Sequence, residues 1–189
     1  MLLQVVDNFL PAGFADDIEK ICKEMPWYLE ENISGRDRSD VFAEEANIEE
    51  SQYGFYHLIL GESGTSQYFD KISPILYFIQ EKTGIVPKEI YRIRLALSTS
   101  INKDVQHYPH ADMDFPHKVL LYYVNDSDGD TFMYNEVYSE YSQSPKNFTI
   151  NQRISPKKNR AVIFDGLRYH SSSKPNKYPT RFIINVDFN

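Results

Sequence analysis

The sequence predicts a mainly β protein, a double-stranded β-helix or jelly roll, with N-terminal helices packed on one sheet. From residue 90 onward, short runs of β-branched, aliphatic and aromatic residues are separated by Asp-Gly, Ser-Pro and Pro-Asn turns. This texture is typical of an antiparallel sandwich or barrel. Before residue 90, two segments carry apolar residues at helical spacing. The composition agrees, since 14 Tyr and 12 Phe beside one Trp are typical of aromatic-rich sheets.

Alternating or continuous apolar patterns bounded by turn residues predict the strands. They are Leu2–Val6, Tyr53–Leu60, Ile90–Thr99, Lys118–Asn125, Thr131–Tyr134, Asn147–Ile154, Arg160–Phe164 and Arg181–Phe188.

Two helices are predicted in the first half of the chain. In the first, from Gly13 to Met25, the apolar residues fall on one face, which we expect to pack against a sheet. The second runs from Ser66 to Thr83 and stops at Gly84. Because Pro74 lies inside it, this helix should be kinked or broken.

Length and composition predict one domain, residues 1–189, with helical support over about 1–89 and a jelly-roll core over about 90–189. Cys22 has no partner for a disulfide, the start lacks a signal peptide, and no apolar stretch is long enough to span a membrane. We therefore expect a cytoplasmic protein without a membrane partner. The net charge of -7 disfavours nucleic-acid binding.

The candidate site begins at His110 and Asp112. Side chains alternate faces in an extended segment, so these two, separated by one residue, project the same way and could hold two corners of one metal ion. A second, distant His would complete a 2-His-1-carboxylate face, which leaves three positions open on Fe(II). A His-x-Asp pair is common by chance, so the pair needs a partner downstream. His107 and His117 are expected to be loop or strand-edge histidines and not ligands.

His170 is the best candidate for the third ligand. It follows the buried-looking strand 160–164 and a turn, so it comes from a different strand than Asp112; alone, it would read as a surface histidine. Arg181 opens the last strand, and an Arg fork is the natural partner of a carboxylate. Strand alternation places Arg181 on the same face as Asn185 and Asp187, which by itself predicts solvent exposure.

Taken together, these residues resemble the Fe(II)- and 2-oxoglutarate-dependent oxygenases, in particular the prolyl 4-hydroxylase-like branch. The resemblance covers roughly residues 90–189. It departs from the branch in having Asp-Gly-Asp-Thr where Gly-Gly-Glu-Thr is more usual, and in a slightly longer spacing from His170 to Arg181. The matching elements, in order, are His110-Ala-Asp112, Leu-Leu-Tyr-Tyr-Val-Asn at 120–125, Asp128-Gly-Asp-Thr131, Arg-Ala-Val-Ile-Phe at 160–164, His170 and Arg181.

The resemblance implies that His110, Asp112 and His170 are the iron ligands and that Arg181 binds the distal carboxylate of 2-oxoglutarate. Arg181 would then point into a polar barrel mouth, with the opposite, apolar face of its strand against the helices. Tyr123 stands where this branch often places a hydroxyl on that same carboxylate; the alternative is an ordinary strand aromatic.

The activity that the resemblance implies is hydroxylation of an unactivated C–H bond by a dioxygenase. The reaction would consume O2 and 2-oxoglutarate, with Fe(II) as cofactor and ascorbate as a supporting reductant. The substrate would be a peptidyl residue, such as proline, or a small molecule.

Two other readings remain open. One is a non-catalytic jelly-roll or cupin-like module that binds a metal or a ligand, although cupins typically use His-x-His with a later Glu. The other is an oxygenase fold that has lost turnover, for which a missing ligand would be expected. The polar segments 32–52 and 136–146 either close over or line the substrate site, or are ordinary surface loops.

Overall fold

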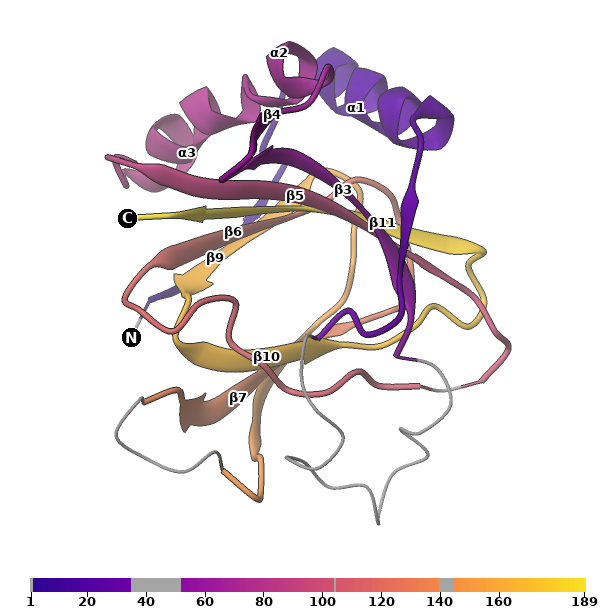
Figure 1. The fold of residues 1–189 in the computed structure, drawn as a ribbon, viewed down its shortest axis with the longest axis vertical. Helices are drawn as coiled ribbons and strands as arrows, with labels where there is room; N and C mark the ends of the chain where they lie inside the picture. The colour runs from indigo at the N-terminus through magenta and orange to yellow at the C-terminus, as the bar shows by residue number, and fades with distance from the viewer. Residues whose placement is uncertain (1, 35–51, 104, 140–144) are drawn as a thin grey trace.

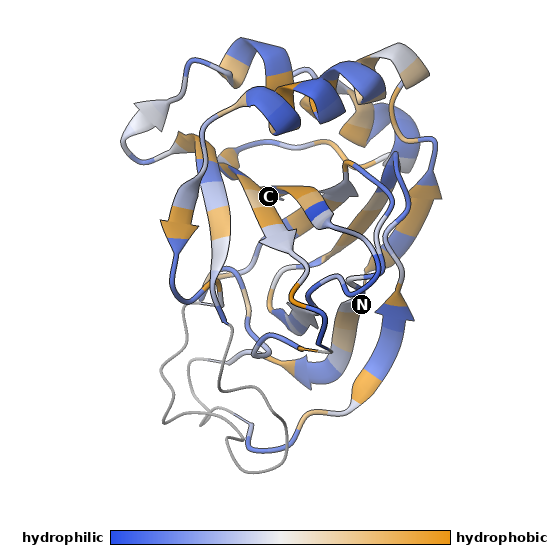
Figure 2. Ribbon diagram, turned by 90° about the vertical axis from the view of Figure 1, so that its right-hand side faces the viewer, coloured by the Kyte–Doolittle hydropathy of each residue, from blue (hydrophilic) through white to orange (hydrophobic). Residues whose placement is uncertain are grey.

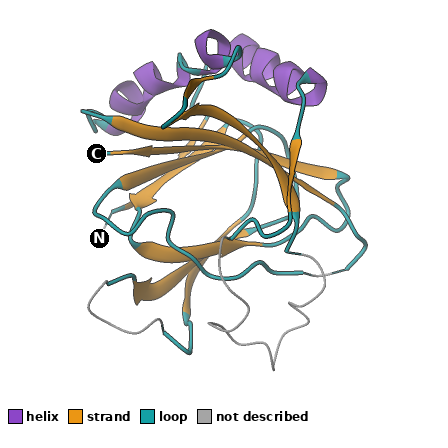
Figure 3. Ribbon diagram, viewed as in Figure 1, coloured by secondary structure: helices purple, strands orange, loops and turns teal. Residues whose placement is uncertain are grey.

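The computed structural model describes residues 2–34, 52–103, 105–139 and 145–189. Two antiparallel sheets face each other, and the helices lie on the outer face of the larger sheet (Figures 1 and 3). This arrangement confirms the jelly roll with helices on one sheet. No helix in the described part of the chain combines the length and the apolarity needed to cross a membrane.

The larger sheet joins strands from both halves of the chain, so the N-terminal region contributes strands as well as helices. Every predicted strand of this sheet is present, with small shifts at its ends, and two short strands, β2 and β4, were not predicted. In spatial order the strands are β1 (Leu3–Asp7), β9 (Arg160–Asp165), β6 (Lys118–Tyr123), β11 (Thr180–Phe188), β5 (Ile90–Thr99), β3 (Gly54–Gly61) and β2 (Tyr28–Glu30), with β4 (Gly64–Thr65) beside β3.

The smaller sheet has the order β10 (Arg168–Ser172), β7 (Thr131–Val137) and β8 (Ile150–Ile154). The bounds of strand β10 were not predicted; His170 lies inside it, after a turn at residues 166 and 167, and is buried. The sequence of β10, Arg-Tyr-His-Ser-Ser, is short and mostly polar, so local propensity gives little sign of a strand. Pairing with β7, not local preference, holds it extended.

The helices pack on the larger sheet through their apolar sides. Helix α1 (Ala12–Glu24) buries Ile18 and Cys22. The second predicted helix is broken at Pro74 into α2 (Phe69–Ile72) and α3 (Ile75–Thr83), as expected from the missing N–H and the ring of proline. It ends at Gly84, whose φ of 74° is left-handed and suits glycine.

The larger sheet separates two apolar layers, because its central strands are buried on both faces. In β6, Leu120 and Tyr122 lie under the helices, whereas Val119 and Leu121 face the smaller sheet. Figure 2 shows the apolar residues in orange along these strands. Such a strand reads as a nearly continuous apolar run, as 119–124 does.

The two faces of strand β11 differ: one is apolar and packs under the helices, and the other carries polar side chains. Phe182, Ile184 and Val186 lie in the layer beneath the helices. The other face carries Arg181, which is 3% exposed, and the fully buried Asp187. The solvent exposure expected from alternation alone is therefore wrong for Arg181, because the second sheet covers that face. The inward direction implied by the family resemblance is right.

The two polar segments described above as possible substrate loops fall largely outside the described residues. These are most of 32–52 and the middle of 136–146. Their proposed relation to the substrate remains a prediction.

Asn159 ties the N-terminal segment to the sheet. Its backbone has a φ of 64°, a left-handed conformation that Asn tolerates better than most residues. Its side chain accepts a hydrogen bond from the Leu10 N–H and donates one to the Leu10 carbonyl, both at 2.8 Å. Its backbone N–H donates to the Tyr123 carbonyl, and its carbonyl accepts from Phe9. One residue thus joins the start of α1, β6 and β9.

We predict that Asn159→Ala lowers the free energy of unfolding by about 2–4 kcal/mol, because the buried Leu10 groups lose their partners and alanine is strained at this φ. Asn102 is the matched control, since it is exposed and has a φ of 55°. Asn102→Ala should cost only the strain, about 1–2 kcal/mol. Urea unfolding of both variants measures the difference, and equal losses would contradict the role given to the side chain of Asn159.

Candidate active site

His110 and His170 are brought together by backbone pairing. His110 lies on the segment between β5 and β6, and its N–H and carbonyl each form a 2.9 Å hydrogen bond with the backbone of His170 in β10. The two imidazole rings consequently lie with their centroids 4.6 Å apart. Asp112, two residues further along the same segment, places its Oδ2 3.3 Å from His170 Nε2. The predicted ligand set therefore converges at one point between the two sheets.

Hydrogen bonds orient both imidazoles for metal binding. The Nδ1 atoms of His110 and His170 lie 3.0 and 3.2 Å from the carbonyl oxygens of Tyr108 and Arg168. A carbonyl can only accept, so each Nδ1 carries the proton and each neutral ring keeps its lone pair on Nε2. A partner on the second nitrogen is the usual support of a metal-binding histidine.

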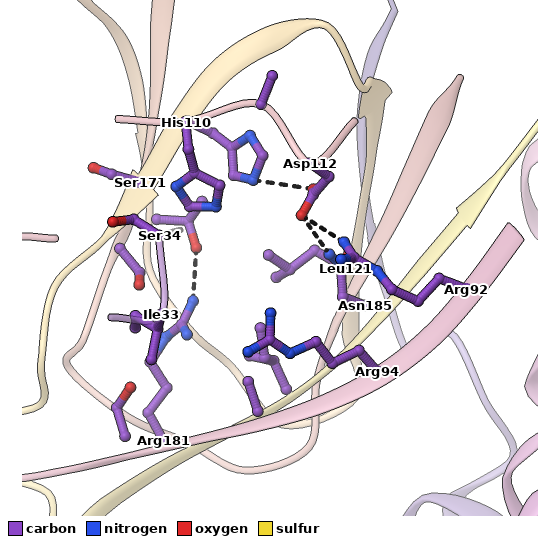
Figure 4. A pocket seen from close by; sticks show the side chains of 17 residues that line it. Ile33, Ser34, Arg92, Arg94, His110, Asp112, Leu121, Ser171, Arg181 and Asn185 are labelled. Atoms are coloured by element: carbon purple, nitrogen blue, oxygen red, sulfur yellow. Dashed lines mark hydrogen bonds and ion pairs between the residues drawn. The ribbon is translucent and has the colours of Figure 1, made fainter. Parts of the chain in front are cut away.

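The two carboxylate oxygens of Asp112 differ in their hydrogen bonds. Oδ1 accepts hydrogen bonds from Arg92 Nη2 at 2.9 Å and Asn185 Nδ2 at 3.2 Å (Figure 4). Oδ2 is buried and accepts none from the described residues. One ligand atom from each of His110, Asp112 and His170 lies within 4.8 Å of the others. Two nitrogens and one oxygen so placed fit a divalent transition metal with open positions on one side.

The electrostatics of the group also fit a cation. Burial opposes a charge on His170, but the adjacent Asp112 carboxylate outweighs it and raises the pKa of His170. Burial likewise opposes ionisation of Asp112, yet His170 and Arg92 lower the pKa of Asp112 well below its ordinary value. The pair thus favours a positive charge between Nε2 and Oδ2. A divalent cation there would take the place of the proton.

His107 and His117 lie outside the strands, His117 directly before β6, which confirms the expected loop and edge positions, and both are buried. His107 is 1% exposed, and its Nδ1 lies 2.9 Å from Ser172 Oγ. His117 is 6% exposed and lies close enough to Asp112 and Asp187 to form a second potential metal group. Arg92 contacts both of these carboxylates, at 2.9 and 2.6 Å, and its charge disfavours a cation there.

Arg181 lies at the other end of the same pocket, which has a volume of about 200 Å³ and is lined also by the three candidate ligands. Its Nη2 donates to Thr131 Oγ1 at 2.9 Å. The Tyr123 hydroxyl donates to the same oxygen at 2.7 Å, and the Tyr123 ring lies 5.5 Å from the guanidinium carbon. Arg181 Nε is buried and has no partner among the described residues. Arg181 therefore offers an unused donor to an anion in the pocket.

The Asp-Gly-Asp-Thr segment positions this end of the pocket. The carboxylate of Asp128 accepts hydrogen bonds from three successive backbone N–H groups, those of residues 176–178, which lead into β11. At Gly129 a β-carbon would lie 2.9 Å from Arg181 Cδ and 2.6 Å from the Ser173 carbonyl oxygen. The absence of a side chain at Gly129 thus makes room for Arg181.

Comparison with known proteins rests on structure alone. No protein-family model and no curated protein sequence matches the chain. Among solved structures, a prolyl hydroxylase from Trichoplax adhaerens in complex with a hypoxia-inducible-factor degradation-domain peptide is 13% identical, with a TM-score of 0.60 over 98% of this chain and 82% of that one. The chain has the fold of the 2-oxoglutarate–Fe(II) oxygenases. The solved structures that share it include prolyl hydroxylases and other members of that group.

Two further structures with this oxygenase fold contain a metal and the co-substrate. HygX from Streptomyces hygroscopicus, with nickel and 2-oxoglutarate bound, is 8% identical, with a TM-score of 0.62 over 99% of this chain and 82% of that one. The epimerase SnoN, in complex with Fe3+, alpha-ketoglutarate and nogalamycin RO, is 12% identical, with a TM-score of 0.58 over 98% and 78%. At these identities the likeness concerns the fold, so the chemistry must be argued from the site.

Sequence reasoning missed several polar residues of the pocket. Arg92 and Arg94 alternate along β5 with Ile93 and Leu95, which are buried beneath the helices. This period of two was visible in the sequence and marks a polar inner face. Thr131 belongs to the Asp-Gly-Asp-Thr segment already noted. That its hydroxyl accepts hydrogen bonds from both Tyr123 and Arg181 could be learned only from the fold.

We predict that Arg92→Lys lowers the affinity for Mn(II) about tenfold, as is typical when a residue that orients a metal ligand is lost. Lysine keeps the charge, but a single ammonium cannot replace the fork that bonds Asp112 and Asp187 together. Arg160→Lys is the control, since Arg160 pairs with Asp7 at the surface. The binding is measured by calorimetric titration at pH 7. Equal Mn(II) affinity in the Arg92→Lys and wild-type proteins would contradict the positioning role.

Proposed function

We propose that the protein is an Fe(II)- and 2-oxoglutarate-dependent dioxygenase that hydroxylates an unactivated C–H bond. The observation that carries the proposal is the combination, in one pocket, of a 2-His-1-carboxylate group whose ligand atoms converge and a buried arginine with a free donor. A module that only binds metal has no need of a buried guanidinium at the far end of the pocket. The bound metals and co-substrates in HygX and SnoN support the same assignment.

In this proposal His110, Asp112 and His170 hold Fe(II), which supplies oxygen activation at its open positions when bound. The protein holds each ligand in place before the metal arrives. The backbone carbonyls of Tyr108 and Arg168 fix the two imidazoles, and Arg92 fixes the carboxylate. Preorganised ligands keep the donor atoms on one side of the ion, so the other side stays available for 2-oxoglutarate and O2.

Arg181 binds the distal carboxylate of 2-oxoglutarate, and Tyr123 and Thr131 support it. Burial lowers the pKa of Arg181, and the interaction with the neighbouring Tyr123 partly offsets this decrease. An incoming carboxylate would supply the counter-charge that the guanidinium lacks. The resemblance assigns the Tyr123 hydroxyl to that same carboxylate, and the Tyr123 ring lies beside Arg181.

The substrate is a peptidyl residue, such as a prolyl residue, or a small molecule. The Trichoplax prolyl hydroxylase, solved with a peptide, and SnoN, solved with nogalamycin RO, show that this fold can bind either a peptide or a small molecule. Ascorbate would act by keeping the iron reduced between turnovers. The pocket lies between the two sheets and is lined by residues of both.

The experiment that tests the function is succinate formation by purified protein supplied with Fe(II), ascorbate, O2 and 2-oxoglutarate. Enzymes of this class turn over slowly without their substrate, so we expect weak wild-type activity. His110→Ala and Arg181→Ala should each lower it at least about 100-fold, since one removes a ligand and the other the charge partner of the co-substrate. Arg160→Ala should retain wild-type activity, because the Arg160 side chain pairs with Asp7 and does not line the pocket.

If no succinate forms and 2-oxoglutarate leaves the visible spectrum of the Fe(II) protein unchanged, the oxygenase proposal is wrong. The binding-module interpretation would then take its place. Succinate formation that survives in His110→Ala would equally remove the assignment of His110 as a ligand.

A further inference from the structure

Arg94 is a third arginine of the pocket, and neither the metal group nor the proposed co-substrate site uses it. It lies on β5, paired with Asn185 on β11, and its side chain lines the pocket. In Figure 4 the guanidinium of Arg92 turns to Asp112, whereas that of Arg94 points into the pocket. The ring of Tyr56 lies 5.0 Å from the Arg94 guanidinium carbon and supports it from one side.

The charge of Arg94 is poorly compensated. Its Nε is buried and makes no hydrogen bond within the described residues. The carboxylate of Glu30 lies 3.7 Å from Nη2, beyond hydrogen-bond distance, and is 38% exposed, so solvent screens it. Burial, followed by the nearby charge of Arg92, lowers the pKa of Arg94. An anion brought to this guanidinium would therefore gain both a charge partner and a free donor.

In the sum of charges of the loaded pocket, the positive charge of Arg94 is matched only by the partly exposed Glu30 among the described residues. Arg92 is paired with Asp112 and Asp187. In the proposed function Arg181 is paired with the distal carboxylate of 2-oxoglutarate. The divalent metal, the two aspartates, dianionic 2-oxoglutarate and these two arginines then sum to zero.

Arg94 and Arg181 serve separate places in the pocket. Arg181 pairs with Ser98, and Arg94 lies four residues away on the same strand as Ser98. This separation corresponds to about 13 Å along the sheet. Arg94 is thus on the Asn185 and Asp112 side, next to the metal group, whereas Arg181 is on the Thr131 side.

We propose that Arg94 binds a carboxylate of the substrate that is hydroxylated, so that this substrate is an organic acid of the amino-acid type. The inference rests on the proposed function and narrows its substrate class. A single guanidinium with one unmatched charge suits a carboxylate monoanion and its two parallel oxygens. A phosphate dianion would leave a negative charge uncompensated.

The test uses protein loaded with Mn(II) and saturated with 2-oxoglutarate under anaerobic conditions, so that binding is measured without turnover. The probes are the N-acetyl and free L-amino acids, each compared by calorimetry with its carboxamide. We expect one or more acids to bind, and the matching amide to bind at least about tenfold more weakly. Arg94→Gln should lower the affinity for the acid about 10- to 100-fold and leave the affinity for the amide unchanged. Arg94→Lys should restore part of the difference.

The affinity for 2-oxoglutarate is the internal control, and it should be the same in wild type and Arg94→Gln. If Arg94→Gln weakens 2-oxoglutarate binding, Arg94 belongs to the co-substrate site and this inference is wrong, while the oxygenase function stands. A panel in which no acid binds better than its amide, or an acid that Arg94→Gln binds as well as wild type, also overturns the inference. If 2-oxoglutarate itself does not bind the Mn(II) protein, it is the proposed function that fails.

Discussion

The site depends on one long-range contact, the pair of backbone hydrogen bonds between His110 and His170. They hold the irregular segment before β6 against β10 of the smaller sheet, and thereby set the distance between the two imidazoles. Asp112 follows within the same short segment, so its place is determined by the same contact. Because the three ligands come from only two pieces of chain, a single pairing is enough to assemble them.

The larger sheet solves the problem of burying charged groups next to an apolar core. On β11 and β5 the residues that face the helices are aliphatic or aromatic, and those that face the second sheet are polar except for Ala96 and Ile183. The cost of burying Arg92 and Arg181 is offset by specific partners: two carboxylates for Arg92, and a threonine hydroxyl and a tyrosine ring for Arg181. The helices therefore cover the apolar face of the sheet, and the candidate site lies on the opposite face.

The three pocket arginines differ in their counter-charges and hydrogen-bond partners, and this difference separates their roles. Arg92 is fully paired and so positions another residue. Arg181 is held by neutral groups and has a free donor at one end of the pocket. Among the described residues, Arg94 has beside it the Tyr56 ring at 5.0 Å and the partly exposed Glu30 carboxylate at 3.7 Å. In a buried site an unmatched charge indicates where an anionic ligand belongs, since leaving it unmatched costs free energy.

The amino-acid sequence by itself determined the residue types of the metal group, the strand-rich second half, the break at Pro74 and the apolar face of the first helix. These follow from local periodicity and from the chemistry of single residues. Only the tertiary structure decided that residues 168–172 form a strand, that Arg181 is buried, and that Arg92, Arg94 and Thr131 belong to the pocket. The reason is physical. The face of a strand that is polar in sequence is solvent-exposed or enclosed according to what covers it, and β10 owes its extended form to β7 and to His110, both distant in the chain.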